Sequence, residues 1–291
     1  MKPAEFNYYA PVSTENALDL LDKLGYGCKL LAGGQSLVPS MNFRLAQPGA
    51  LVDLNQIVEL SYIKETNDGG VVIGAMTRDS QVEHDLLIKQ KYPVIPDAFH
   101  FVAHPQIRNR GTFGGAIAHA DPTGQVPALV LALNARCHIR AKSGERWVPA
   151  EEFFIGPFTT VLKPNELLVE IAIPPVAPRS GMSYKQMARQ AGAQALVGVV
   201  AVMTLDEQKR CKQTRLVLLS VGETPVLAKE ASKFLIGKEL TSDVIQHSAE
   251  LASGKDIDPG SDIHCSIEFR RHLARELSGM ALQEAFTRAI Q

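Results

Sequence analysis

Two adjacent glycines follow a short apolar run near the N-terminus, in the segment AGGQS at residues 32–36. The preceding residues 28–32 are typical of a buried strand, and residues 13–25 are typical of a helix ended by Gly25. A helix interrupted by Pro39 is expected over residues 36–45, and a second strand over residues 50–54. This order predicts a small β–loop–α–β unit, whose glycines allow positive φ and a close approach to the main chain.

Such a loop has two interpretations. Successive main-chain N–H groups, together with the positive end of the following helix, form a site suited to a pyrophosphate. Ser36 can cap that helix or donate to a phosphate oxygen. A tight turn between strand and helix explains the same glycines equally well, so the loop alone does not decide between them.

Three known glycine motifs are absent. The spacings G-x-G-x-x-G and G-x-x-x-x-G-K-[ST] of nucleotide-binding folds do not occur at this loop. The hydrolase motif G-x-S-x-G would place its second glycine at Val38, and a bulky side chain would crowd that strained turn. These absences exclude the nucleotide-fold and serine-hydrolase interpretations.

A second glycine loop occurs at residues 108–116, with the sequence RNRGTFGGA, followed by HADP at 119–122. Paired glycines, a hydroxyl and two flanking arginines suit an anionic ligand with a long polar stem. The residues after them supply groups that suit ribityl or ribose hydroxyls. Arg108 and Arg110 are also explained by a solvated loop, so the case depends on two such loops occurring in one chain.

The rest of the chain changes character at the proline-rich run 174–178, which we interpret as a domain boundary. Mixed strands and helices are expected before it, and three strands followed by three helices after it, which predicts a separate α+β domain. The expected strands are 71–73, 137–140, 167–173, 183–188, 196–205 and 215–221, and the expected helices are 81–90, 126–133, 226–235, 243–252 and 266–289.

Composition narrows the classes further. The 291 residues are 45% hydrophobic and 21% charged with a net charge of −1, so no overall field favours nucleic acid or an anionic membrane. We expect a soluble cytoplasmic protein, because the first residues lack a signal peptide and the apolar run 195–205 is too short for a bilayer. The four scattered cysteines predict buried thiols rather than an iron–sulfur cluster. His100 and His104 have helical ligand spacing but no third ligand nearby, so no metal site is expected.

With both loops placed, the sequence resembles the FAD-binding medium subunit of molybdenum hydroxylases, the group that includes carbon monoxide dehydrogenase and xanthine dehydrogenase. LLAGGQSLVP at 30–39 looks like the first FAD motif of that family, and TFGG at 112–115 looks like the second. The resemblance implies an α+β fold, with a two-part FAD-binding domain of the vanillyl-alcohol-oxidase/PCMH type at 1–176 (subdomains about 1–57 and 58–176). A small α+β C-terminal domain, a three-stranded sheet plus helices, then occupies 177–291.

The resemblance also implies a set of cofactor contacts. Backbone groups of the first loop would hold the pyrophosphate of noncovalent FAD, the second loop would line the polar side of the flavin, and later residues would reach the sugars or pack on the cofactor. These residues are Leu31, Ala32, Gly33, Gly34, Gln35, Ser36, Leu37, Thr112, Gly114, Gly115, Ala118, Asp121, Gln125, Leu168 and Lys185. Leu168 is equally explained as a core residue, and Lys185 as an exposed strand lysine.

The chain departs from the family pattern at three places. Ala116 replaces a common Asn, Gln125 replaces an acidic residue, and residues 190–194 lack an acidic-aromatic pair. A neutral acceptor in place of a carboxylate weakens FAD binding by on the order of 1 kcal/mol.

The function implied by the resemblance is electron transfer, with no catalytic acid or base on this chain. A large subunit would carry the molybdenum cofactor and a small one the 2Fe-2S clusters, in a heterohexamer, with FAD passing electrons to an external acceptor. Two alternatives are a stand-alone FAD-dependent oxidoreductase with its own substrate pocket and a non-enzymatic assembly protein. The substrate and the acceptor are not readable from this chain.

Overall fold

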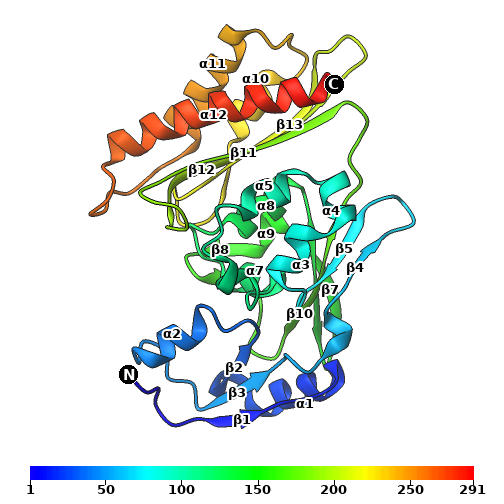
Figure 1. Cartoon of the computed structure of the whole chain (residues 1–291), viewed down its shortest axis with the longest axis vertical. Coiled ribbons are helices and arrows are strands. Elements are labelled where there is room, and N and C mark those ends of the chain that lie inside the picture. The colour runs from blue at the N-terminus through cyan, green and yellow to red at the C-terminus, as the bar shows by residue number, and fades with distance from the viewer.

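The computed structural model describes residues 1–291 and arranges them in three units along the long axis of the molecule (Figure 1). The N-terminal unit lies at one end, a mixed unit lies in the middle, and a sheet covered by helices lies at the other end. The predicted combination of α and β elements is confirmed.

The N-terminal unit is a three-stranded sheet of order β1-β3-β2, parallel throughout. The expected first helix is α1, capped by the side chain of Ser13 and ended at Gly25, whose φ is +51°. Its apolar face buries Ala17, Leu18 and Leu21 against the sheet. The elements are β1 (Asn7–Tyr9), α1 (Thr14–Leu24), β2 (Cys28–Leu31), α2 (Leu37–Asn42) and β3 (Ala50–Asp53).

The middle unit is an antiparallel sheet of order β4-β5-β10-β6-β7 with helices packed on one face. The apolar core between them contains Phe99, Phe113 and Phe153, each with a fully buried side chain. A two-stranded pair, β8 with β9, adjoins it. The elements are β4 (Ile63–Glu65), β5 (Val71–Gly74), α3 (Asp79–His84), α4 (Leu86–Lys91), α5 (Val94–Phe99), α6 (Pro105–Arg108), α7 (Phe113–His119), α8 (Gln125–Ala132), β6 (Arg136–Ala141), β7 (Gly144–Pro149), α9 (Ala150–Phe153), β8 (Phe154–Gly156), β9 (Thr159–Thr160) and β10 (Leu167–Ile173).

The C-terminal unit has a sheet of order β11-β12-β13-β14, and its two faces contribute to two different apolar cores. Along β12, Val199 and Ala201 pack against the C-terminal helices, whereas Val200 joins the core of the middle unit. Two-sided burial explains why this strand has a continuous apolar sequence instead of an alternating one. The elements are β11 (Ser180–Ala188), β12 (Ala195–Leu205), β13 (Cys211–Leu219), β14 (Val226–Leu227), α10 (Lys229–Leu235), α11 (Ser242–Leu251) and α12 (Ile267–Ala289).

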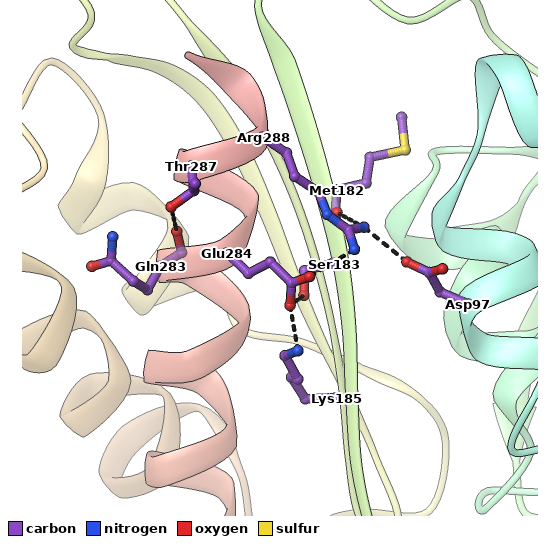
Figure 2. Close-up of polar contacts among 8 residues, drawn as sticks. All are labelled: Asp97, Met182, Ser183, Lys185, Gln283, Glu284, Thr287 and Arg288. Carbon is purple, nitrogen blue, oxygen red and sulfur yellow. Dashed lines mark hydrogen bonds and ion pairs between the residues drawn. The ribbon is translucent and has the colours of Figure 1, made fainter. Parts of the chain in front are cut away.

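A polar network fastens α12 to the middle unit (Figure 2). Arg288 donates to Asp97 Oδ2 on α5 at 2.8 Å and to the main-chain oxygen of Met182 on β11 at 2.8 Å. Its other nitrogen donates to Glu284 Oε1 at 2.6 Å. One guanidinium therefore links three elements from two units.

Several sequence predictions were wrong in detail. The helix expected over 81–90 is two helices, because Asp85 is extended and its carboxylate caps α4 at Ile88 N. The helix expected from Val226 begins only at Lys229, since residues 226–227 pair with β13 as a fourth strand beside the three expected ones. The helix after the first loop ends at Asn42, before residue 45. His100 and His104 lie at the end of α5 and before α6, not on one helix.

The four cysteines are all buried, as predicted. Burial raises the pKa of the Cys137 thiol to about 12, and burial with the nearby Asp206 does the same for Cys211. None of the helices is both long and apolar enough to cross a bilayer.

The packing of β11 on α12 depends on a glycine. A Cβ on Gly181 would lie 1.9 Å from the Ala285 oxygen, so Gly181→Ala forces the strand and helix apart. We expect the urea midpoint to fall by the equivalent of about 1–3 kcal/mol. The control Gly279→Ala on α12 itself meets only ordinary contacts at 3.9 Å and removes a helix glycine. It should leave the midpoint unchanged or raise it. Equal midpoints for the two variants would contradict this account of the packing.

Candidate functional site

The first glycine loop lies where the parallel strands β2 and β3 end. Leu31 aligns with Asp53 in the register of these strands, so the residues after both share one edge of the sheet. Ligands bind at this edge in open parallel sheets. A cavity of about 340 Å³ opens there. It is lined by Leu31, Ala32, Gly33, Gly34, Gln35, Val38, Pro39, Asp53, Asn55 and Arg110.

The main chain of the first loop presents unused donors. None of the N–H groups from Gly33 to Ser36 donates to another group of the protein. Gly34 has φ +73°, a value that glycine adopts without strain, and the side chain of Gln35 donates to the Gly33 oxygen at 2.9 Å. Ser36 makes no capping hydrogen bond, and α2 has only six residues. The donors are therefore the loop amides themselves, and the helix contributes little.

The two glycine loops touch each other. A Cβ on Gly33 would lie 2.4 Å from the Arg110 oxygen and 2.7 Å from Gly111 Cα. A Cβ on Gly115 would lie 3.4 Å from Ala32 Cβ. Glycine at position 33 is therefore required for the close approach of these two main-chain segments, which are about 80 residues apart in the sequence.

The second segment is not a loop throughout, contrary to expectation. Phe113–His119 forms α7, and Thr112 caps it by accepting from Gly115 N at 3.2 Å. Gly114 N donates to Ala75 O at 3.0 Å, and a Cβ on Gly114 would lie 2.5 Å from that of Ala75. Most donors of this segment are thus engaged within the protein. It forms a close-packed wall beside the first loop instead of a second row of free amides.

Asp79 lies behind this wall, and its carboxyl group is buried with one oxygen unpaired. It is 5% exposed, its Oδ1 has no hydrogen-bond partner, and its main-chain N–H donates to Gly111 O at 3.0 Å. Burial raises the pKa of this carboxyl to about 7, although Arg78 and Arg108 oppose the shift. Oδ2 occupies the space that a side chain at Gly111 would need.

Three predicted residues lie along or beyond α7. Ala118 is exposed on that helix. Asp121 follows it, and its Oδ1 accepts from the N–H and the hydroxyl of Thr123, both at 2.8 Å. Gln125 is 9% exposed and donates to Gln186 Oε1 on β11 at 3.0 Å. Ala118 lies three residues after Gly115 on α7, whereas Asp121 and Gln125 lie beyond the end of this helix, which is about 10 Å long.

A larger cleft of about 720 Å³ opens beside Pro122 and Thr123. Pro157 of the middle unit also lines it, and the remaining walls come from the C-terminal unit, including residues of the segment 190–194 that departs from the family pattern. Its buried wall includes Ser220 Oγ and Arg270 Nε, which have no hydrogen-bond partner.

Leu168 and Lys185 lie elsewhere. Leu168 is 4% exposed and belongs to the core of the middle unit. Lys185 forms an ion pair with Glu284 on the α12 face of β11 (Figure 2). Burial would raise the pKa of Glu284, but Lys185, Ser183 and Arg288 outweigh it and hold that pKa below its usual range. Alternate strand residues face opposite ways, so Gln186 lies on the other face of β11, and the expected contact of Lys185 with the cofactor stays a prediction.

Sequence reasoning missed Asp53, Asn55 and Arg78. The signal for the first two was available, because they follow a strand parallel to the one before the glycine loop. Asp53 Oδ2 accepts from Tyr8 OH at 2.5 Å, and its Oδ1 accepts from Asn55 N at 2.9 Å. Arg78 had no sequence signal, since its place beside the loops results from folding of the middle unit.

The cap of α7 gives a first test of the site. Thr112→Ala removes the acceptor for Gly115 N and should lower the free energy of unfolding by about 0.5–2 kcal/mol relative to Thr112→Ser, which keeps the hydroxyl. Urea unfolding of both variants measures this difference. Equal stability would show that the hydroxyl is not a cap.

The buried carboxyl of Asp79 gives a second test of the site. Its pKa in the folded protein, about 7, lies above its ordinary value of 3.8, so its contribution to stability is complete below the lower value and lost as pH rises through the upper one. We expect the urea midpoint of the parent protein to fall relative to Asp79→Asn between about pH 5 and pH 8. The exposed Glu207→Gln is the control and should follow the parent. Parallel profiles for Asp79→Asn and the parent would refute the raised pKa.

The sequence was compared with protein families and with known proteins. Residues 4–176 match the family described as the FAD binding domain in molybdopterin dehydrogenase, and residues 182–285 match the CO dehydrogenase flavoprotein C-terminal domain. The chain is 38% identical to the 6-hydroxypseudooxynicotine dehydrogenase complex subunit alpha of Paenarthrobacter nicotinovorans, over 99% of this chain and 97% of that protein. It is 36% identical to the carbon monoxide dehydrogenase medium chain of Hydrogenophaga pseudoflava, over 99% of both.

Comparison with solved structures gives the same family. Carbon monoxide dehydrogenase from Hydrogenophaga pseudoflava, in a form lacking the Mo-pyranopterin moiety of its cofactor, matches with a TM-score of 0.95 and 38% identity over 99% of each chain. Quinoline 2-oxidoreductase from Pseudomonas putida 86 matches with a TM-score of 0.94 and 34% identity over all of both chains. The chain therefore belongs to the family of FAD-binding medium subunits of molybdenum hydroxylases, the flavoprotein components of multi-subunit oxidoreductases.

Proposed function

We propose that this chain transfers electrons within a multi-subunit molybdenum hydroxylase. Bound FAD would supply the redox chemistry, between 2Fe-2S clusters on a small subunit and an external acceptor. Substrate reacts at a molybdenum cofactor on a large subunit. The observation that carries the proposal is the row of free amides from Gly33 to Ser36 at a cavity, in a chain of the FAD-binding family.

The residues present fit a dinucleotide. Four main-chain donors without partners suit the oxygens of a pyrophosphate. The carboxylate of Asp53, in the same cavity, suits a ribose hydroxyl, which acidic groups accept from in other dinucleotide sites. We assign the pyrophosphate to residues 31–37 and the adjoining wall to Thr112, Gly114 and Gly115.

The flavin end is assigned to the far end of α7. Ala118, Asp121 and Gln125 lie there, and the larger cleft opens beside them. Such a cleft leaves room for an electron acceptor to approach from solvent. Leu168 would contribute from the core of the middle unit, and Lys185 remains a proposed cofactor contact that is paired with Glu284 in this structure.

The proposed partners rest on the relatives, two of which are named as the medium chain of carbon monoxide dehydrogenase and the medium subunit of nicotine 6-hydroxylase. We assign the 2Fe-2S clusters and the molybdenum cofactor to a small and a large partner subunit, in a cytoplasmic heterohexamer. Gel filtration and subunit analysis of the complex from its host test the assembly.

We also propose a division into an FAD-binding domain, 1–176, with parts at about 1–57 and 58–176, and a C-terminal domain, 177–291. The two family matches end and begin close to this boundary. Because Val200 and Leu219 of the C-terminal sheet share the core of the middle unit, the two domains should unfold together.

A stand-alone FAD-dependent oxidoreductase is the second candidate, and the 720 Å³ cleft is the observation in its favour. Turnover of an organic substrate separates the two. The FAD-loaded chain alone should not oxidise substrates that the whole complex oxidises with a dye acceptor. Turnover by the isolated chain would favour the second candidate.

The first glycine loop gives a direct test of cofactor binding. Gly33→Ala drives a methyl group against the Arg110 oxygen and displaces the loop. We expect FAD affinity to fall about tenfold or more, equivalent to ~1.4 kcal/mol or more. The control is Gly27→Ala in the same unit, where a Cβ has nothing within 4 Å. Flavin fluorescence titration measures both. A Gly33→Ala protein that binds FAD as tightly as the control would contradict the assigned site.

A further inference from the structure

Two side chains form a hydrogen-bonded bridge between the glycine loops. Arg78 Nη1 donates to the Arg110 oxygen of the second segment at 2.5 Å, and Arg78 Nη2 donates to Asn55 Oδ1 at 2.7 Å. Asn55 Nδ2 then donates to the Ala32 oxygen of the first loop at 2.8 Å. We call this chain of contacts the Arg78–Asn55 bridge. It joins the N-terminal unit, which carries Ala32 and Asn55, to the middle unit, which carries Arg78 and Arg110.

The bridge also acts on the direction of an amide. A peptide group is planar, and no peptide bond of this chain is cis, so its C=O and N–H point opposite ways. Asn55 holds the Ala32 oxygen and thereby fixes the direction of the Gly33 N–H, the first of the free donors. Gln35 holds the Gly33 oxygen in the same manner and fixes the Gly34 N–H.

The two ends of the bridge hold different parts of the site. At one end, Asn55 sets the direction of the loop amide. At the other, Arg78 holds the Arg110 carbonyl, which Gly33 also approaches, and so sets the distance between the loops. Arg78 N in turn donates to Gln81 Oε1 at 3.0 Å, which anchors the start of α3.

We propose that Arg78 and Asn55 are positioning residues for the cofactor, which hold the two glycine loops at the separation and amide orientation that the pyrophosphate requires. The inference rests on the proposed function, because the ligand of these loops is the assigned FAD. Neither side chain acts by charge on the ligand. The guanidinium acts through its two-pronged geometry, which a lysine cannot reproduce.

The test compares FAD affinity and stability in four variants of the full chain. Arg78→Lys keeps the charge but loses one arm of the bridge, and Asn55→Ala removes its other half. Both should lower FAD affinity about tenfold, by flavin fluorescence titration, while the urea midpoint of the apoprotein stays close to that of the control. The control is Arg140→Lys, which alters the Arg140–Glu15 contact of 3.0 Å between the same two units, away from the loops.

The fourth variant combines Arg78→Lys and Asn55→Ala. Because Arg78 Nη2 and Asn55 Oδ1 contact each other, each single variant already removes this shared contact, so the loss of FAD affinity in the double variant should be smaller than the product of the two single losses. Independent contributions would multiply the two losses and overturn the bridge. Full FAD affinity in Arg78→Lys would show that charge alone matters and would also overturn it.

Two further outcomes separate the bridge from simpler accounts. A fall in the apoprotein midpoint that matches the loss of affinity would show a merely structural role and overturn the positioning claim. A parent chain that binds no FAD would overturn the proposed function and this inference together. Normal FAD binding by the parent and by both single variants would overturn the inference alone.

Discussion

The close approach of two main-chain segments at Gly33 is the constraint on which the candidate site depends. The Arg110 oxygen and Gly111 Cα occupy the place of a side chain at position 33. This contact brings together the carboxyl edge of a parallel sheet and the start of α7, which belong to different units of the fold. The contact leaves the amides of the first loop facing a cavity without partners, and main-chain donors in that state suit a pyrophosphate.

The two glycine segments differ in how their main-chain N–H groups are used. The first loop keeps its N–H groups free, whereas the second engages most of its own in capping α7 and in contacts with Ala75 and Thr77. A close-packed wall beside free donors, whose peptide groups are held by Asn55 and Gln35, preorganises a binding site, because little conformational entropy remains to be lost on binding. The C-terminal unit adds a cleft at the far end of α7 and is itself held to α5 by Arg288 (Figure 2).

Local sequence signals predicted much of this architecture. The helix capped by Ser13, the strands beside the first loop and the apolar β12 were all readable, because capping and periodicity are local properties. The helix at 113–119 was not, since two glycines disfavour a helix that tertiary packing against Ala75 nevertheless stabilises. Arg78 and the pairing of Lys185 with Glu284 depend on contacts distant in sequence. The family motifs pointed to the cofactor region, whereas the two faces of β11 could be told apart only from the fold, which pairs Lys185 with Glu284 and Gln186 with Gln125.

The most direct measurement is an experimental structure of this chain with FAD bound. The account predicts the pyrophosphate against the amides of Gly33 to Ser36, with the dinucleotide running along α7 toward Asp121. The Arg78–Asn55 bridge should be intact beneath it. FAD density confined to the larger cleft, with the first loop facing only water, would contradict the account.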